Sequence, residues 1–209
     1  MKNWIISLGM IAALGITGCQ KEDDKLPILG RQQEVDGKTV YHTIPDFAFV
    51  DQDSATVRRE DFMGKKIYVA DFFFTSCTTI CPAMKTQMMR IYEAYENDDR
   101  VALLSHSIDP EYDTQPVLEN FASRLGVSSQ KWHFLTGVSQ EAMFAHGQKG
   151  YIVTATADRS VPDGILHSGA FLLVDTEGRI RGKYDGTKPL EVDRLIGDIK
   201  ILLKEEEGK

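Results

Sequence analysis

Apolar and polar positions from Pro45 onward form a regular succession of strand-like and helix-like patterns. The run from Lys66 to Thr75 is almost continuously apolar and rich in β-branched and aromatic residues, which is typical of a strand covered on both faces. Apolar side chains between Met84 and Tyr95 then fall at helical spacing, and Pro82 favours a helix start just before them. This part of the chain therefore predicts a central strand followed by an amphipathic helix.

The alternation continues toward the C-terminus. A strand is predicted over Arg100 to Ile108 and a helix over Thr114 to Leu125, ended by Gly126. The remaining patterns predict a short helix, a further segment, a hairpin of two strands and a last helix, over Ser139 to His146, Tyr151 to Ala157, Ala170 to Val174 with Arg179 to Tyr184, and from Leu190 on. This order predicts an α/β protein with a thioredoxin-like fold, in which a central mixed sheet is flanked by helices and consecutive strands are parallel.

The first 18 residues have the pattern of a bacterial lipoprotein signal. A basic Lys2 precedes an apolar run from Trp4 to Ile16, and two small residues lead to Cys19. The run is shorter than the roughly 20 residues that a membrane-spanning helix needs. We therefore expect residues 1–18 to be removed and Cys19 to carry the lipid that attaches the protein to a membrane outside the cytoplasm.

The expected organisation has three parts. Residues 1–18 are the signal peptide, residues 19–44 are polar and poorly periodic and are interpreted as a lipid-anchored tether, and residues 45–207 form one domain. Over the whole chain, 24 basic residues stand against 31 acidic ones, so that the formal net charge is −7. This charge has the wrong sign for a surface that binds phosphate groups, and nucleic acid is not an expected partner.

Cys77 and Cys81 lie where the predicted central strand gives way to a helix, at the carboxyl end of the sheet. Their spacing places both thiols on one helix face, with Cα atoms about 6 Å apart, within reach of a disulfide or of one shared ion. A purely structural disulfide is a weak alternative, because so short a loop removes little chain entropy. A structural zinc site is also a weak alternative, because it requires four ligands and the chain has no further free cysteine to supply one. Copper and thiol redox chemistry both remain open.

Two sulfurs and one imidazole suit copper, so that the choice among five histidines matters. His167 lies between a loop and a strand, at a junction that faces the cysteines in a thioredoxin-like layout. His106 lies within a predicted strand and is the second choice. Met84, Met88 and Met89 also carry soft sulfur, but their helical spacing favours packing.

The segment from Asp71 to Met84 (DFFFTSCTTICPAM) closely resembles the signature of the Sco/SenC family of thioredoxin-fold copper proteins, which help to assemble cytochrome c oxidase. Four further segments are similar to the family's pattern: Ser107 to Thr114, Trp132 to Gly137, His167 to Asp175 and Tyr184 to Thr187. Thr78 and Thr79 depart from it, because many members carry Pro-Asp between the two cysteines.

The resemblance implies that Cys77, Cys81 and His167 bind copper, as Cu(I), Cu(II) or both, and that oxidation of the Cys77–Cys81 pair to a disulfide would abolish binding. It implies a metallochaperone that delivers copper to the binuclear site of oxidase subunit II, with other copper chaperones or thiol reductants as further partners. A thiol-disulfide reductase, which would be an enzyme, and a redox or copper sensor of the same fold are the alternatives. Asp71 and Asp109 are candidates for tuning the site or for contacting a partner.

Overall fold

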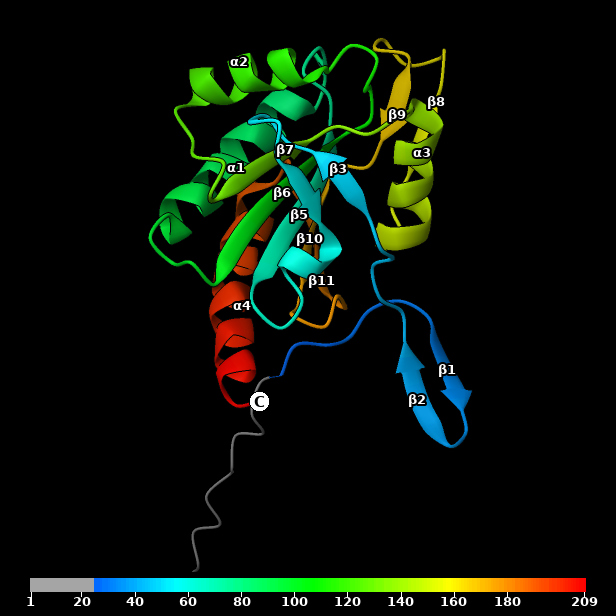
Figure 1. The fold of residues 1–209 in the computed structure, drawn as a ribbon, viewed down its shortest axis with the longest axis vertical. Helices are drawn as coiled ribbons and strands as arrows, with labels where there is room; N and C mark the ends of the chain where they lie inside the picture. The colour runs from blue at the N-terminus through cyan, green and yellow to red at the C-terminus, as the bar shows by residue number, and fades with distance from the viewer. Residues whose placement is uncertain (1–24) are drawn as a thin grey trace, which may run out of the picture.

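The computed structural model describes residues 25–209, and its centre is a five-stranded sheet with the strand order β11-β10-β5-β6-β7 (Figure 1). Strands β5, β6 and β7 are parallel, and β10 runs antiparallel to both β5 and β11. The five strands span Ile67–Phe73 (β5), Val101–Ser107 (β6), Trp132–Leu135 (β7), Ala170–Val174 (β10) and Ile180–Asp185 (β11). The mixed sheet and the parallel order of the consecutive strands confirm the predicted architecture.

Helices cover the sheet as the apolar patterns predict. Helix α1 spans Cys81–Tyr95 with a proline in its first turn, α2 spans Gln115–Leu125 and α4 spans Pro189–Glu207. The Tyr95 hydroxyl donates to the carbonyl of Ile196 at 2.7 Å, which joins α1 to α4. Gly126 ends α2 in the left-handed conformation, at φ 69°, where the absence of a side chain avoids strain.

Alternate side chains of β5 face opposite layers, because successive side chains in a strand point to opposite faces. Phe73 contacts Phe121 of α2, with ring centroids 5.6 Å apart. Phe72 faces the other way and contacts His106 and Tyr151, at 5.0 and 5.3 Å. Both faces are buried, which accounts for the near-continuous apolar sequence of this strand.

Several elements were not recognised from the sequence. One of them is a π-helical turn over His146–Tyr151, which directly follows the predicted short helix, α3, Gln140–Ala145. The short strands are β3 (Ala48–Val50), β4 (Thr56–Arg58), β8 (Ala155–Ala157) and β9 (Ile165–His167), and a 3-10 turn spans Arg59–Asp61. Each is too short to show a clear hydrophobic period, so that pattern alone does not separate it from a loop.

The described part of the expected tether contacts the domain. Leu26 and Leu29 pack against the core, and Leu29 forms a bridge with Ile180 of β11. Beyond them, an antiparallel hairpin of β1 (Gln32–Val35) and β2 (Lys38–Tyr41) is largely exposed, which explains its polar sequence. The signal peptide and Cys19 lie outside the described residues.

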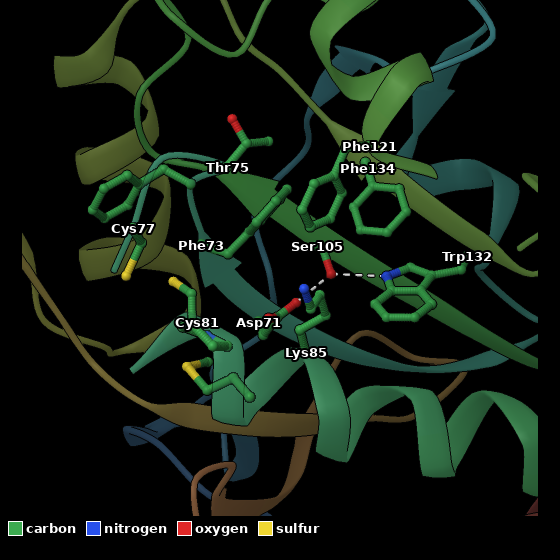
Figure 2. Close-up of a pocket in the computed structure, with 13 residues that line it drawn as sticks. Asp71, Phe73, Thr75, Cys77, Cys81, Lys85, Ser105, Phe121, Trp132 and Phe134 are labelled. Atoms are coloured by element: carbon green, nitrogen blue, oxygen red, sulfur yellow. Dashed lines mark hydrogen bonds between the residues drawn. The ribbon is translucent and has the colours of Figure 1, made fainter. Parts of the chain in front are cut away.

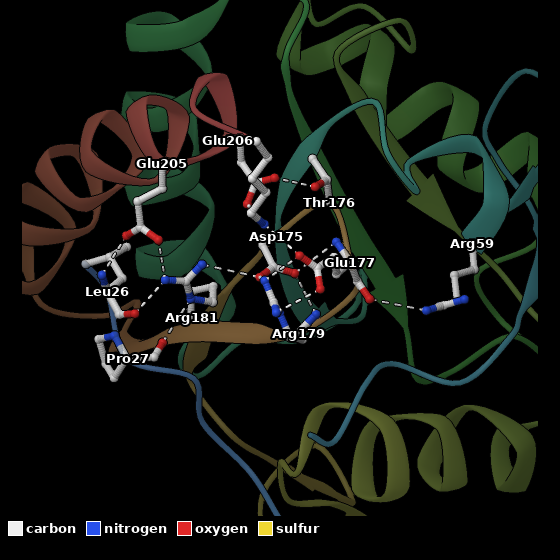
Figure 3. Close-up of polar contacts among 11 residues, drawn as sticks. Leu26, Pro27, Arg59, Asp175, Thr176, Glu177, Arg179, Arg181, Glu205 and Glu206 are labelled. Carbon is white, nitrogen blue, oxygen red and sulfur yellow. Dashed lines mark hydrogen bonds and ion pairs between the residues drawn. The ribbon is translucent and has the colours of Figure 1, made fainter. Parts of the chain in front are cut away.

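Figure 3 shows how the chain is held where it enters the domain. The Arg181 guanidinium, 4% exposed, donates to the carbonyls of Leu26 and Pro27 at 2.5 and 3.1 Å. It also pairs with Asp175 and Glu205, at 3.3 and 2.6 Å.

None of the helices in residues 25–209 is both long enough and apolar enough to cross a membrane.

Candidate metal centre

Cys77 and Cys81 lie in the loop and the helix start that follow β5. Cys81 is the first residue of α1, whereas Cys77 lies in the preceding loop, where its N–H donates to the carbonyl of Phe74 at 3.2 Å. The expectation that both thiols share one helix face is therefore wrong, because the helix begins only at the second cysteine. Both side chains are buried, and no disulfide joins them in the structure.

His167 closes the site from a different part of the chain. It ends β9, just before β10, and its Nε2 lies 3.8 Å from Sγ of Cys77 and 3.5 Å from Sγ of Cys81. The ring packs against Phe74 with centroids 5.6 Å apart. One ligand atom from each of these three residues lies within 4.8 Å of the others, so that the predicted set of donors is brought together.

A small cavity of about 50 Å³ lies beside the two thiols. Figure 2 shows both sulfur atoms at one end of the cavity and a polar row, Asp71, Ser105 and Trp132, farther inside. The Ser105 hydroxyl donates to Asp71 at 2.5 Å and accepts from the Trp132 indole N–H at 2.8 Å. Aromatic rings of β5, α2 and β7 form much of the remaining wall, which keeps this space apolar.

The two thiols have different proton affinities. The hydrogen bond from Cys81 lowers the pKa of the Cys77 thiol to about 3, against the opposing effect of burial, and His167 and Thr79 lower it further. The same hydrogen bond and burial raise the pKa of Cys81 above its usual value. The pair therefore loses one proton readily, and Cys77 is the side chain that carries the negative charge. A thiolate is the form that ligates soft metals and attacks disulfides.

The acidic residues proposed from sequence occupy different positions. Asp71 is buried in the cavity wall, and burial raises the pKa of its carboxyl group to about 7, with Ser105 and His167 opposing the shift. Because it is buried, Asp71 presents no surface to a partner. Asp109 is half-buried, and its N–H donates to the Ser107 hydroxyl at 3.1 Å. The described hydrogen bonds do not connect Asp109 to the three donors.

Asp113, which lies in the same acidic loop as Asp109, supports the cysteine loop instead. Its carboxylate accepts from the Thr75 N–H at 3.1 Å and from the Thr75 hydroxyl, two residues before Cys77. The Ser107 hydroxyl donates to the same carboxylate at 2.6 Å. The only sequence signal was its place at the end of an acidic loop after β6, which it shared with Asp109.

The other histidines lie away from the thiols. His106 is fully buried between Phe72 and Tyr151, as its place within a strand suggested, and its neighbour His146 is 5.0 Å away between ring centroids. His133 pairs with Asp51 at 3.0 Å, and His42 contacts the carbonyl of Gly150. Met84 and Met88 are buried in the core, which confirms that they are packing residues.

The donor set discriminates among metal ions. Two sulfurs about 2.3 Å from an ion and a nitrogen about 2.0 Å from it fit within the observed separations after a small adjustment. A structural zinc site would need a fourth ligand, and among residues 25–209 the cluster contains three. Thiolate sulfur favours Cu(I), and imidazole accepts either copper oxidation state. The geometry therefore suits copper better than zinc.

Comparison with known proteins supports the same assignment. The family model described as SCO1/SenC matches residues 35–204. A SCO1/SenC family lipoprotein from Bacillus anthracis is 29% identical, with a TM-score of 0.70 and coverage of 78% of this chain and 95% of that one. BsSco, described as a member of the Sco family of cytochrome c oxidase assembly proteins, is 31% identical, with a TM-score of 0.67 and coverage of 77% and 93%.

A copper-bound structure is also among the similar proteins. ScoI of Arabidopsis thaliana, solved with copper bound, is 25% identical, with a TM-score of 0.61 and coverage of 77% of this chain and 98% of that one. Together with the two structures above, this likeness confirms the predicted thioredoxin-like fold of the central sheet and its helices.

Proposed function

The chain belongs to the SCO1/SenC family, and from this premise we propose that it is a copper chaperone that binds copper through Cys77, Cys81 and His167 and delivers it to the binuclear copper site of cytochrome c oxidase subunit II. The observation that carries the proposal is the convergence of two thiols and one imidazole within 4.8 Å, from segments 90 residues apart in the sequence. Copper is the cargo in this proposal, and the protein supplies a site that can load and release it.

The arrangement supports a transferable site. Three donors leave copper coordinatively unsaturated, so that a ligand of the receiving protein can attach before the chaperone's ligands leave. The low pKa of Cys77 provides a thiolate at neutral pH without the help of a metal. Oxidation of the two thiols to a disulfide, with two electrons passing to an acceptor disulfide, would remove both sulfur ligands and end binding.

The reductase remains the second candidate, and one observation favours it. The charged Cys77 and the protonated Cys81 are an attacking thiolate and a resolving thiol, the pair that disulfide reduction requires. The cavity beside them, lined by Phe73, Phe121 and Phe134, offers little room for a substrate loop. Copper handling is therefore the primary proposal.

Titration of the reduced protein with Cu(I) and Cu(II), in competition with chelators of known affinity, tests the function. We expect one copper per chain, with binding at least about 100-fold weaker in Cys77→Ala, Cys81→Ala and His167→Ala, because each removes one ligand. His133→Ala is the matched control, since this histidine is paired with Asp51 away from the thiols. A parent protein that binds no copper but cycles rapidly with disulfide substrates would replace the chaperone with the reductase.

We also propose that Cys19 carries a lipid and that residues 1–18 are removed. The similar Bacillus anthracis protein is a lipoprotein, and Leu26, held by Arg181, lies seven residues after Cys19. Seven residues span at most about 25 Å. The domain would therefore be held close to the membrane, and the tether would be shorter than residues 19–44.

The orientation of the domain follows from the sheet. Val174 pairs with Tyr68 at the start of β5, and Asp175 and Arg181 lie at this end, whereas Cys77 follows the other end of the same strand. A strand of seven residues separates the two ends by roughly 20 Å. The thiols would then face away from the lipid surface, toward membrane proteins with extended domains.

Mass spectrometry of the membrane fraction checks the lipid on Cys19, and Cys19→Ser should release the protein. Neutron reflectometry of the lipidated protein on a supported bilayer then measures the height of the domain. Insertion of a Gly/Ser linker before Lys25 should raise this height. An unchanged height would contradict attachment through the segment ahead of Leu26.

A further inference from the structure

The strand that carries His167 is not part of the central sheet. Strand β9 pairs with β8 alone, with Ala155 opposite His167, and the two form a separate two-stranded hairpin. The loop between them, residues 158–164, turns at Gly164, which has φ +72°, a conformation that favours glycine. The position of His167 over the thiols therefore depends on what holds this hairpin against the rest of the domain.

Asp163, at the end of that loop, joins the hairpin to the cysteine loop. Its carboxylate accepts from the N–H of Thr78 at 3.1 Å, from the Thr78 hydroxyl at 2.8 Å and from the Thr79 hydroxyl at 3.2 Å. We refer to these three residues as the Asp163 cluster. Among the described side-chain hydrogen bonds of residues 158–164, those that leave the loop are the three made by Asp163.

The members of the Asp163 cluster are close in sequence to two of the proposed ligands. Asp163 precedes His167 by four residues on the hairpin, and Thr78 directly follows Cys77. The Thr79 hydroxyl also lies 3.5 Å from Sγ of Cys77. One carboxylate thus joins the imidazole's strand to the loop of the first thiol.

We propose that Asp163 is a positioning residue that keeps His167 over the two thiols before copper arrives. This inference rests on the proposed function, because it concerns the same three donors. Without the Asp163 cluster, the hairpin samples positions in which Nε2 of His167 is out of reach of an ion held by the sulfurs. Copper would then meet two thiols and would have to recruit the imidazole afterwards.

The expected effect follows from the fraction of molecules that hold all three donors in place. When a binding-competent state is only partly populated, the apparent dissociation constant rises by the inverse of that population. Three exposed hydrogen bonds to a carboxylate contribute a modest free energy, so that we expect copper affinity to fall about 5- to 10-fold. Loss of a ligand itself would cost more, and this difference separates positioning from ligation.

The test compares Asp163→Ala with Asp158→Ala in the full chain. Asp158 is a matched control, because it lies in the same loop but accepts only from Ser160, at 2.8 and 2.6 Å. The first readout, on the copper-free protein, is hydrogen exchange at the Thr78 amide and at the amides of β9. The second is the Cu(I) dissociation rate, and the third is the nitrogen coupling in the electron paramagnetic resonance spectrum of the Cu(II) form.

We expect the amides of Thr78 and β9 to exchange faster in Asp163→Ala than in the parent. This variant should also release copper about 5- to 10-fold faster and show heterogeneous nitrogen coupling. Asp158→Ala should behave as the parent in all three measurements. Asp163→Asn, which retains one acceptor oxygen, should fall in between. Equal behaviour of the Asp163 and Asp158 variants would overturn the proposal. So would faster exchange with unchanged copper release and spectrum.

The proposed function and this inference fail separately. If the parent chain binds no copper, the copper chaperone is refuted, and the exchange data alone then decide whether Asp163 holds the hairpin. A double-mutant cycle of Asp163→Ala and Thr78→Val, with hydrogen exchange of the β9 amides as the measured quantity, gives the coupling free energy between the two side chains. A coupling near zero would show that the Asp163 contact with the Thr78 hydroxyl does not position the strand.

Discussion

At the end of the sheet where β5 and β6 finish, several buried imidazole nitrogens have no hydrogen-bond partner, whereas most buried charged groups at the opposite end are paired. Within the described residues, both ring nitrogens of His106, Nε2 of His146 and Nδ1 of His167 are unpartnered. At the other end, the Asp175 carboxylate pairs with Arg179 and Arg181, at 2.7 and 3.3 Å. Arg181 in turn reaches Glu205 and the backbone where the chain enters.

The difference shows how one fold separates stability from function. A buried polar group costs free energy when it is unpaired, so that an unpaired group persists only where the surroundings hold it. In the proposed site, Nε2 of His167 and the two sulfurs need to stay available to an ion, and the contacts of Nε2 with the sulfurs are long, at 3.8 and 3.5 Å. Asp175 and Arg181 have no such need, and their contacts tie β10, β11, α4 and residue 26 together.

The largest change in stability is expected at the end of the sheet that holds Asp175 and Arg181. Arg181→Met removes one partner and leaves Asp175, which is fully buried, short of a counter-charge. Breaking a buried pair costs about 3–5 kcal/mol, which is an upper limit here because Arg179 still pairs with Asp175, and urea denaturation should show a marked fall in the free energy of unfolding. Copper affinity should be unchanged, because the thiols lie at the other end. A variant as stable as the parent would show that water replaces the ion pair.

Acid should act mainly on the unsatisfied end. Burial lowers the pKa of His146 to about 4 and, with a smaller effect of His146, that of His106 well below its usual 6.5. Below pH 6.5 these histidines are therefore protonated in the unfolded chain but still neutral in the folded chain. The free energy of unfolding then falls as the pH is lowered, until the pKa of the folded state is reached. The loss is about 1.4 kcal/mol per pH unit for each histidine.

Comparison with His146→Phe isolates this effect from other titrating groups. The raised pKa of Asp71 works in the opposite direction, because its folded form takes up a proton near pH 7 and gains stability as the pH falls toward 3.8. The difference in unfolding free energy between the parent and His146→Phe should shift by about 2 kcal/mol between pH 7 and pH 5. A pH-independent difference would contradict the unprotonated state of His146 in the fold.

Much of this comparison was accessible from sequence, but unevenly. The apolar runs that form β5 and β6 and the helical spacing that forms α1 carry strong periodic signals, and these elements were predicted correctly. The set Cys77, Cys81 and His167 was predicted from ligand chemistry and from the resemblance. The loop position of Cys77 was not, because the residue at which a helix begins depends on local contacts that a spacing rule does not contain.

Other features depend on contacts between distant segments. Asp163 and Thr78 are 85 residues apart, and neither has a periodic neighbourhood that indicates their meeting. The same holds for Arg181 and Leu26, which are 155 residues apart. The π-helical turn that brings His146 to His106 has no sequence signal of its own, because a π turn differs from an α turn only in hydrogen-bond register.

His106 tests whether its unpartnered nitrogens are a real cost. Replacing it with leucine removes two unsatisfied polar atoms, worth about 1–3 kcal/mol, and loses the ring contact with Phe72, worth about 0.5–1.5 kcal/mol. His106→Leu should therefore be more stable than the parent by about 1 kcal/mol at pH 7.5. On the neighbouring strand, His133→Leu should be less stable, because it removes the imidazole that pairs with the buried Asp51 carboxylate. Destabilisation by both would indicate hydrated nitrogens in His106.

The smallest effect is expected for Arg194, which lies on α4 near β11 but is half exposed. It pairs with Glu191 at 2.6 Å and lies over the Tyr184 ring, 4.3 Å from its centroid. Exposed ion pairs contribute about 0–1 kcal/mol and are screened by salt, and methionine keeps part of the ring contact. Arg194→Met should therefore cost about 0.5 kcal/mol, with a smaller cost in 1 M NaCl, whereas the cost of Arg181→Met should persist there. Equal costs for the two arginines would mean that burial does not distinguish them, and the satisfied end would then owe its stability to packing.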